Sequence, residues 1–304
     1  MEQRTSRAAT PSPASGANPL SRRRFIALGG GAVLLAACGS SGSAKSGATS
    51  GQPKSFTDVA PGIVSMDLYA SPEPQRFGFA LLAKEGYASG KPARVAFAPP
   101  GGTPSVFVPA VARAKGLPDF RGVYTVTTKF DRAGIWRGVL AYEGKQTPFV
   151  FQVAAKPASP IAGGAAPRAA SPTTADTLGV HPICTRDPVC PLHTKSLKSL
   201  VGAGRPVAVM FATPARCQTR YCGPVLDTML PMVQTYAHRI DFVHVEIYKN
   251  NQTTDVIPTV AAWNLGGEPW LFGVDGKGLV TARLDGAFDG GEMKNLLDDL
   301  AARA

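Results

Sequence analysis

The spacing of apolar residues changes near residue 180, and this change most constrains the fold. Between residues 62 and 153, short segments such as 64–69 and 122–130 alternate apolar and polar residues and are separated by turns. Six or seven such segments predict an all-β domain. Beyond residue 180, continuous apolar runs such as 206–212 alternate with amphipathic stretches such as 225–233. This order predicts an α/β domain with buried strands between helices.

The expected elements and domain boundaries follow from the same pattern. Residues 156–178 are rich in Ala, Pro, Gly and Ser and are interpreted as an interdomain linker between domains at 57–155 and 179–304. Further strands are expected in the first domain at 76–82, 93–98, 106–109, 134–142 and 148–153. In the second domain, strands are expected at 240–247, 270–274 and 279–284, and helices from Gly223, over 256–265 and over 292–302.

The N-terminus has the pattern of an export signal. Three arginines, Arg22 to Arg24, precede thirteen apolar or small residues at 25–37. This stretch is shorter than the roughly 20 residues that span a bilayer, and it fits a cleaved secretory signal over 1–37. The arginines followed by Phe25 resemble a twin-arginine signal.

Residues 35–38 resemble a bacterial lipobox, which implies cleavage before Cys38 and lipidation of its sulfur. The chain is then expected on the outer face of the cytoplasmic membrane, with residues 38–56 as a flexible tether. The alternative is a plain cleaved signal with an incidental cysteine. Five arginines in residues 1–37 contribute much of the net charge of +11, and the rest of the chain has no run of basic residues. A nucleic-acid partner is therefore not expected.

Five cysteines are present, and lipidation of Cys38 would leave two close pairs, which tend to oxidise outside the cytoplasm. Within one continuous helix, Cys217 and Cys222 would lie beyond the usual Cα limit of about 6.8 Å for a disulfide. Cys217 is therefore expected in a loop and Cys222 at the N-terminus of the following helix. There the helix dipole, with Arg216 and Arg220, would favour a thiolate.

Two segments resemble thioredoxin-like proteins. "VAVMFATPARCQTRYCGP" is similar to their active-site strand and helix, and "EPWLFGVDGKGLVTARLDGAF" is similar to their proline hairpin. The resemblance covers about 180–304 and implies a thioredoxin-like α/β fold in which Pro269 is a cis-proline facing the cysteines. The pair departs from that pattern, with four residues between the cysteines and Val225 at the position of the second cysteine of "CGPC". Which cysteine attacks is left open.

The first domain also carries a resemblance. "GVYTVTTKFDRAGIW" is similar to the end of periplasmic immunoglobulin-like domains. This similarity implies an immunoglobulin-like β-sandwich over 57–155, used for binding or spacing. The expected fold class is therefore a two-domain chain, with an all-β sandwich followed by an α/β thioredoxin-like domain.

The expected function is thiol–disulfide exchange with extracytoplasmic protein thiols and disulfides, through Cys217 and Cys222. One alternative is a structural disulfide in a non-catalytic binding or scaffold lipoprotein, which gains support because "VAVMFA" lacks the buried acid of thioredoxins. A copper-handling protein of the Sco type is less favoured, because no histidine follows His244, where that family places a ligand. A peroxidase is weakly supported, because the full peroxidatic motif is absent from the sequence.

The remaining cysteines have two interpretations. His181, Cys184, Cys190 and His193 could provide a Cys₂His₂ zinc site. A Cys184–Cys190 disulfide that fixes the lead-in segment is favoured for an exported chain. No metal or other cofactor is therefore expected.

Overall fold

The structure is a computed structural model that describes residues 58–84, 86–118, 122–217 and 219–304. The expected signal segment 1–37, the lipidation site Cys38 and the tether 38–56 lie outside the described residues. Within the described ranges, none of the helices combines the length and the apolar character needed to cross a membrane.

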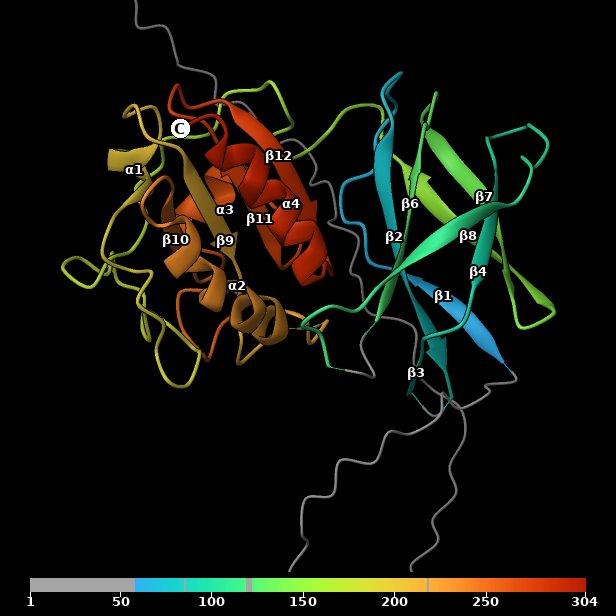
Figure 1. Cartoon of the computed structure of the whole chain (residues 1–304), viewed down its shortest axis with the longest axis horizontal. Coiled ribbons are helices and arrows are strands. Elements are labelled where there is room, and N and C mark those ends of the chain that lie inside the picture. The colour runs from blue at the N-terminus through green and yellow to red at the C-terminus, as the bar shows by residue number, and fades with distance from the viewer. Residues whose placement is uncertain (1–57, 85, 119–121, 218) are drawn as a thin grey trace, which may run out of the picture. The chain divides into compact units, whose positions relative to one another are not determined.

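The first part of the chain forms one eight-stranded sheet, in the order β1-β2-β6-β5-β4-β7-β8 with β3 beside β2 (Figure 1). All neighbours are antiparallel, and β5 joins the halves because its first residues pair with β4 and its last residues with β6. The first and last strands approach each other, and the Thr147 hydroxyl donates to the Val59 carbonyl at 3.0 Å. The strands are β1 Val59–Ile63, β2 Gln75–Ala83, β3 Gly86–Ala88, β4 Ala93–Ala98, β5 Val108–Arg113, β6 Val123–Thr128, β7 Gly134–Tyr142 and β8 Lys145–Val153.

Aromatic side chains fill the inside of this sheet. Phe77 is fully buried, and its ring centroid lies 4.8 Å from that of Phe151 and 5.0 Å from that of Phe97. Phe130 contacts the same group and Trp136. Alternate residues of each strand point to this core, which explains the alternating sequence pattern.

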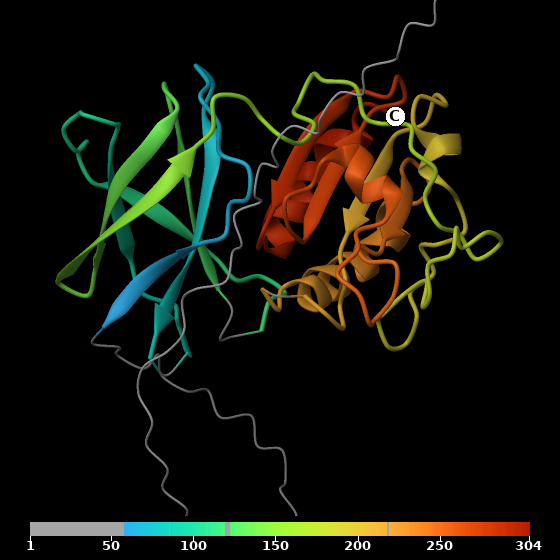
Figure 2. The ribbon, with the colours of Figure 1, turned by 180° about the vertical axis from the view of Figure 1, so that it is seen from behind.

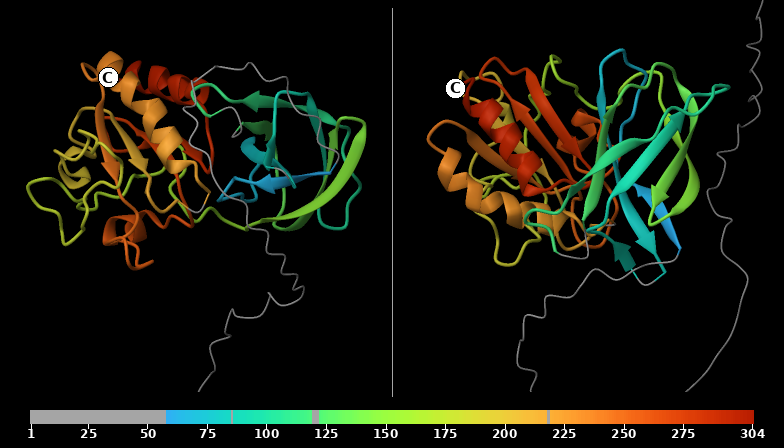
Figure 3. Two further views of the ribbon diagram at one scale, coloured as in Figure 1. Left: turned by 90° about the horizontal axis from the view of Figure 1, so that it is seen from below. Right: turned by 45° about the vertical axis from the view of Figure 1, so that its right-hand side comes forward.

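The second part contains a four-stranded sheet in the order β10-β9-β11-β12. Strands β9 and β10 are parallel, and the other pairs are antiparallel. Every residue of β9 and β11 is buried, because these central strands are covered on both faces. Helices α2 and α4 lie side by side on one face (Figure 3). The elements are β9 Val207–Phe211, α2 Cys222–Tyr236, β10 Asp241–Val245, β11 Trp270–Val274, β12 Val280–Asp285 and α4 Gly290–Ala301.

The other face of this sheet is covered by two short helices and irregular chain (Figure 2). Helix α1, Leu197–Leu200, has four residues, and α3, Pro258–Trp263, has six. Ala166 and Val180, outside any helix, pack into the same core. The segment 156–178, expected as a linker, is bonded to the sheet, with the Gly163 amide donating to the Val280 carbonyl at 2.8 Å.

The fold class predicted from the sequence is wrong. Among the described residues, strand residues outnumber helical ones, and the first eight strands form one nearly closed sheet instead of an immunoglobulin-like sandwich. The second region has a β-sheet with few helices and is not clearly an α/β thioredoxin-like fold. The error has a physical cause: alternation shows that a strand has one buried face, but a sandwich and a curved sheet produce the same alternation.

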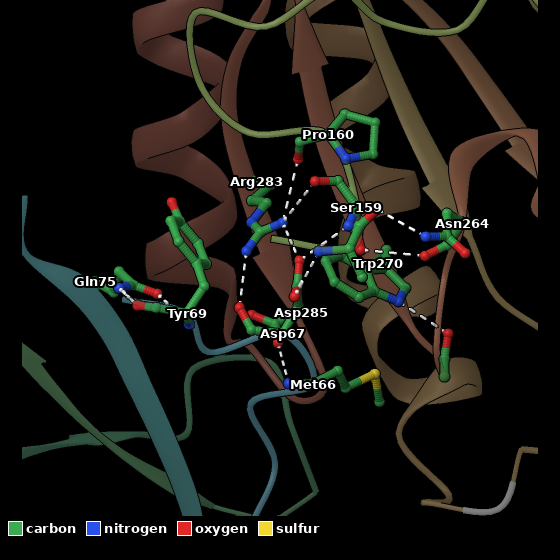
Figure 4. A network of polar contacts seen from close by, with 12 residues as sticks. Met66, Asp67, Tyr69, Gln75, Ser159, Pro160, Asn264, Trp270, Arg283 and Asp285 are labelled. Carbon is green, nitrogen blue, oxygen red and sulfur yellow. Dashed lines mark hydrogen bonds and ion pairs between the residues drawn. The ribbon is translucent and has the colours of Figure 1, made fainter. Parts of the chain in front are cut away.

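A buried polar network connects the two sheets (Figure 4). Arg283 on β12 donates to the Asp67 carboxylate at 2.8 Å and to its carbonyl oxygen at 2.9 Å. The Asp67 carboxylate also accepts from the amides of Ala158 and Ser159, each at 3.0 Å. The Asp67 carboxylate therefore holds together the segment before β2, the segment after β8 and strand β12.

Candidate functional site

Cys217 and Cys222 are joined by a disulfide, with their Cα atoms 5.7 Å apart. Strand β9 ends at Phe211, and α2 begins at Cys222. The pair therefore lies between the carboxyl end of a central buried strand and the first residue of a helix. The intervening loop places Cys217 outside the helix, and this position brings its sulfur within bonding reach of Cys222.

The two sulfurs have different environments. Cys222 is completely buried, whereas Cys217 is half-buried. The Cys222 amide donates to the Cys217 sulfur at 3.1 Å, and the Thr219 hydroxyl lies 3.2 Å from the same sulfur. Tyr221 at the N-cap of α2 makes no side-chain capping bond. The Cys217 sulfur thus accepts a hydrogen bond from the helix N-terminus, where negative charge is stabilised.

Glu268, which precedes Pro269 in the segment before β11, lies near this disulfide. The peptide bond between Glu268 and Pro269 is cis. A carboxylate oxygen of Glu268 lies within 4.8 Å of both cysteine sulfurs, and only 3% of the residue is exposed. Burial raises the pKa of this carboxyl to about 7, while a hydrogen bond from Tyr248 opposes the shift. Near neutral pH the group can therefore take up or release a proton beside the sulfurs.

Glu268 was missed by the sequence analysis, which looked for a buried acid within β9. The acid is supplied by a different segment, directly before Pro269. Its sequence signal is an acidic residue immediately before Pro269 and the apolar strand β11.

A pocket of about 470 Å³ opens beside the disulfide. Its lining includes Glu268 and Thr219, and Thr219 is the residue whose hydroxyl contacts the Cys217 sulfur. Neither Cys217 nor Cys222 is among the residues that line the pocket. The other lining residues include Met66, Ile247, Tyr248 and Gly267.

The two arginines expected beside the pair lie in different surroundings. The Arg216 guanidinium donates to the carbonyl oxygens of Asn250 and Thr253 and lies over the Tyr248 ring, 5.3 Å from its centroid. Arg220 is exposed and has a φ of 59°. The two hydrogen bonds of Arg216 thus hold the loop 250–253 against the cysteine loop.

Cys184 and Cys190 form a second cluster and are not joined by a disulfide, contrary to the expectation from sequence. Both are buried together with His193 and His244, and one ligand atom from each of the four residues lies within 4.8 Å of the others. The physical reason for the missing Cys184–Cys190 disulfide is that both imidazoles converge on the two sulfurs. The hydrogen bond from Cys190, with further hydrogen bonds from the imidazoles, lowers the pKa of Cys184.

The histidine pair of this cluster differs from the pair expected from sequence. His181 is exposed and is not part of the group, and His244 from β10 takes its place. His244 is 51 residues beyond His193, so no local motif connects them.

Comparisons of the chain with protein-family models, with curated proteins and with solved structures found no match. Its function is therefore inferred from the two cysteine sites. The Cys217–Cys222 pair includes a half-buried cysteine and lies near the buried carboxyl of Glu268, whereas Cys184 and Cys190 are both buried.

Proposed function

We propose that the protein catalyses thiol–disulfide exchange with other proteins through Cys217 and Cys222. The observation that carries the proposal is the asymmetry of the pair: Cys217 is half-buried and its sulfur accepts a hydrogen bond from the Cys222 amide, whereas Cys222 is completely buried. A partner can reach the first sulfur and not the second. Cys217 is therefore the exchanging cysteine and Cys222 the resolving one.

The reaction in the reducing direction has two steps. The Cys217 thiolate attacks one sulfur of a partner disulfide, a mixed disulfide forms, and the partner's other sulfur leaves as a thiolate and takes a proton. Cys222 then attacks the Cys217 sulfur, forms the intramolecular disulfide and releases the second partner thiolate. Two electrons pass from the cysteine pair to the partner, and the opposite direction reverses each step.

Glu268 supplies the proton transfer that the buried cysteine needs. The Cys222 thiol must lose a proton before it attacks, and its burial keeps bulk water away. The Glu268 carboxylate lies within 4.8 Å of the pair and has a pKa raised to about 7 by burial. It therefore accepts the Cys222 proton in the resolving step and returns it in the reverse reaction.

The proposed place of action is the outer face of the cytoplasmic membrane. The support is the sequence of the N-terminus, with its arginines, short apolar stretch and Cys38. An oxidising compartment supplies protein disulfides as partners.

Mixed-disulfide trapping in the full chain tests the roles of the two cysteines. Cys222→Ser leaves the accessible sulfur without its resolving partner, so it should accumulate covalent complexes that a reductant releases. Cys217→Ser is the matched control and should trap none, because its remaining sulfur is buried. Equal trapping by both variants would overturn the assignment.

The reduction potential separates a catalytic disulfide from a structural one. We expect a value above about −300 mV, because structural disulfides of secreted proteins usually lie below it. A lower value, together with no trapped partner, would leave a binding or scaffold protein with a structural disulfide as the better description.

A further inference from the structure

We propose that Cys184, Cys190, His193 and His244 form a tetrahedral zinc site. The proposal concerns a separate group of residues and does not depend on the redox activity. All four residues are buried. Three come from the irregular segment before α1, and His244 comes from the end of β10, one residue before its last.

The distances between the side-chain atoms suit a single small ion. Zinc bonds of about 2.3 Å to sulfur and 2.0–2.1 Å to nitrogen place tetrahedral ligands about 3.4 Å apart for two nitrogens and about 3.6 Å for nitrogen and sulfur. His193 Nε2 and His244 Nδ1 are 3.1 Å apart. The Cys190 sulfur lies 3.2 Å from His193 Nε2 and 3.3 Å from His244 Nδ1, and the Cys184 sulfur lies 3.8 Å from His244 Nδ1.

The surrounding hydrogen bonds prepare His244 to bind a metal. Its Nε2 lies 2.9 Å from the carbonyl oxygen of Ala212, and a carbonyl can only accept. Nε2 therefore carries the hydrogen, and Nδ1 keeps its lone pair directed at the two sulfurs. Metal-bound histidines commonly donate their other N–H to a carbonyl or carboxylate in this way.

The loop between the two cysteines is also fixed independently of an ion. The Thr185 amide and hydroxyl donate to one oxygen of Glu246, at 2.6 and 3.0 Å. The His244 amide donates to the Leu192 carbonyl at 3.0 Å, which holds the residue next to His193 against β10. The four ligands are therefore preorganised by neighbouring backbone and side-chain bonds.

The donor set favours zinc among the available metals. Two thiolates and two imidazoles in a closed, buried site are typical of structural zinc, whereas Cu²⁺ prefers tetragonal sites rich in nitrogen and oxygen. Zinc coordination would also keep two neighbouring cysteines from forming a disulfide in an oxidising compartment.

The site lies where it can order the redox loop. His244 holds the Ala212 carbonyl at the start of that loop, and the Thr185 hydroxyl accepts from the Ala215 amide at 3.1 Å, two residues before Cys217. The contacts of the cluster thus reach the segment that positions the exchanging sulfur.

Metal analysis of the purified full chain tests the proposal. We expect one zinc per chain, and after exchange with Co²⁺ we expect the visible bands of tetrahedral cobalt and a sulfur-to-cobalt charge-transfer band. Cys190→Ser and His244→Gln should lose the metal. His181→Ala is the matched control and should keep it, because that exposed histidine lies outside the cluster.

A measurement on the unaltered protein covers the case in which these variants fail to fold. Release of zinc by a chelator should expose two additional reactive thiols per chain. The double variant Cys217→Ser/Cys222→Ser should retain zinc, which separates this proposal from the redox function. A Cys184–Cys190 disulfide, copper in place of zinc, or a folded chain that takes up no zinc would each overturn it.

Discussion

At the scale of single residues, Glu268 determines how exchange should depend on pH. In the proposed mechanism its carboxylate form accepts the Cys222 proton, so the resolving step should accelerate as the pH rises through about 7, the pKa to which burial raises this carboxyl. Glu268→Gln cannot accept the proton. We expect stopped-flow exchange with a dithiol substrate to slow on the order of 100-fold at neutral pH and to lose this inflection.

Stability measurements on the same variant check the protonation of Glu268. Because the folded pKa is raised, folding is favoured most below the unfolded value of about 4.3, and this contribution is lost as the pH rises through about 7. The wild type should therefore weaken over this interval relative to Glu268→Gln. Glu73→Gln, an exposed control, should leave both profiles unchanged, and an equal effect in both variants would rule out the proton-transfer role.

Residues close in sequence could be predicted to meet, and distant ones could not. The five-residue spacing of Cys217 and Cys222 predicted a loop followed by a helix start, and α2 does begin at Cys222. Glu268 and His244 were not predicted as site residues, because the chain returns to each site through the pairing of β11 and β10 with β9. Single-sequence patterns do not determine such long-range register.

At the scale of elements, the start of α4 offers a direct test of local stability. Asp289 caps the helix by accepting from the Gly291 and Glu292 amides at 3.0 and 2.9 Å, and Glu292 completes a capping box. The second carboxylate oxygen of Asp289 accepts a hydrogen bond from the Lys115 amide at 3.1 Å. Loss of a cap costs about 1 kcal/mol, so Asp289→Ala should lower the free energy of unfolding by at least about that amount.

Urea denaturation measures this loss, and Asp299→Ala is the matched control. Asp299 belongs to the same helix, and its ion pair with Arg303 is exposed, of the kind that contributes about 0.3–0.5 kcal/mol. If both variants lose the same stability, the capping bonds do not fix the start of α4.

Most individual strands could be predicted, and the exceptions have local causes. The apolar runs at 93–98 and 134–142 coincide with β4 and β7. Segment 64–69 alternates like a strand but forms none, because its polar groups bind the other sheet: the Met66 amide donates to Asp285, and Asp67 binds Arg283. Alternation alone did not reveal which surface the polar face would meet.

At the scale of the whole molecule, the described residues fall within one compact unit, and the bond between Asp67 and Arg283 connects its two sheets. Their side chains are only 5% and 14% exposed. Arg76 on β2 adds a second connection, 2.7 Å from the Glu292 carboxylate on α4. Because these contacts join the part of the chain that carries the first sheet to β12 and α4, we expect the wild type to unfold in a single cooperative transition.

Removal of the Asp67 carboxylate should reduce the cooperativity of unfolding. Asp67→Ala leaves the Arg283 charge buried without its partner and the Ala158 and Ser159 amides without their acceptor. Loss of one partner from a buried ion pair costs about 3–5 kcal/mol, so the variant should unfold at lower urea concentration. Hydrogen-exchange mass spectrometry should show the two sheets opening separately in this variant and together in the wild type.

Asp58→Ala provides the control for this prediction. Asp58 pairs with Lys145 at 3.6 Å, but the two side chains are 94% and 60% exposed, so the pair should contribute about 0–1 kcal/mol. The two variants remove the same carboxylate group from the same part of the chain and differ in burial and in the partner sheet. A similar small loss in both, with exchange still concerted, would mean that the Asp67–Arg283 contact does not couple the sheets. A large loss in Asp67→Ala alone would identify this carboxylate as the main connection between them.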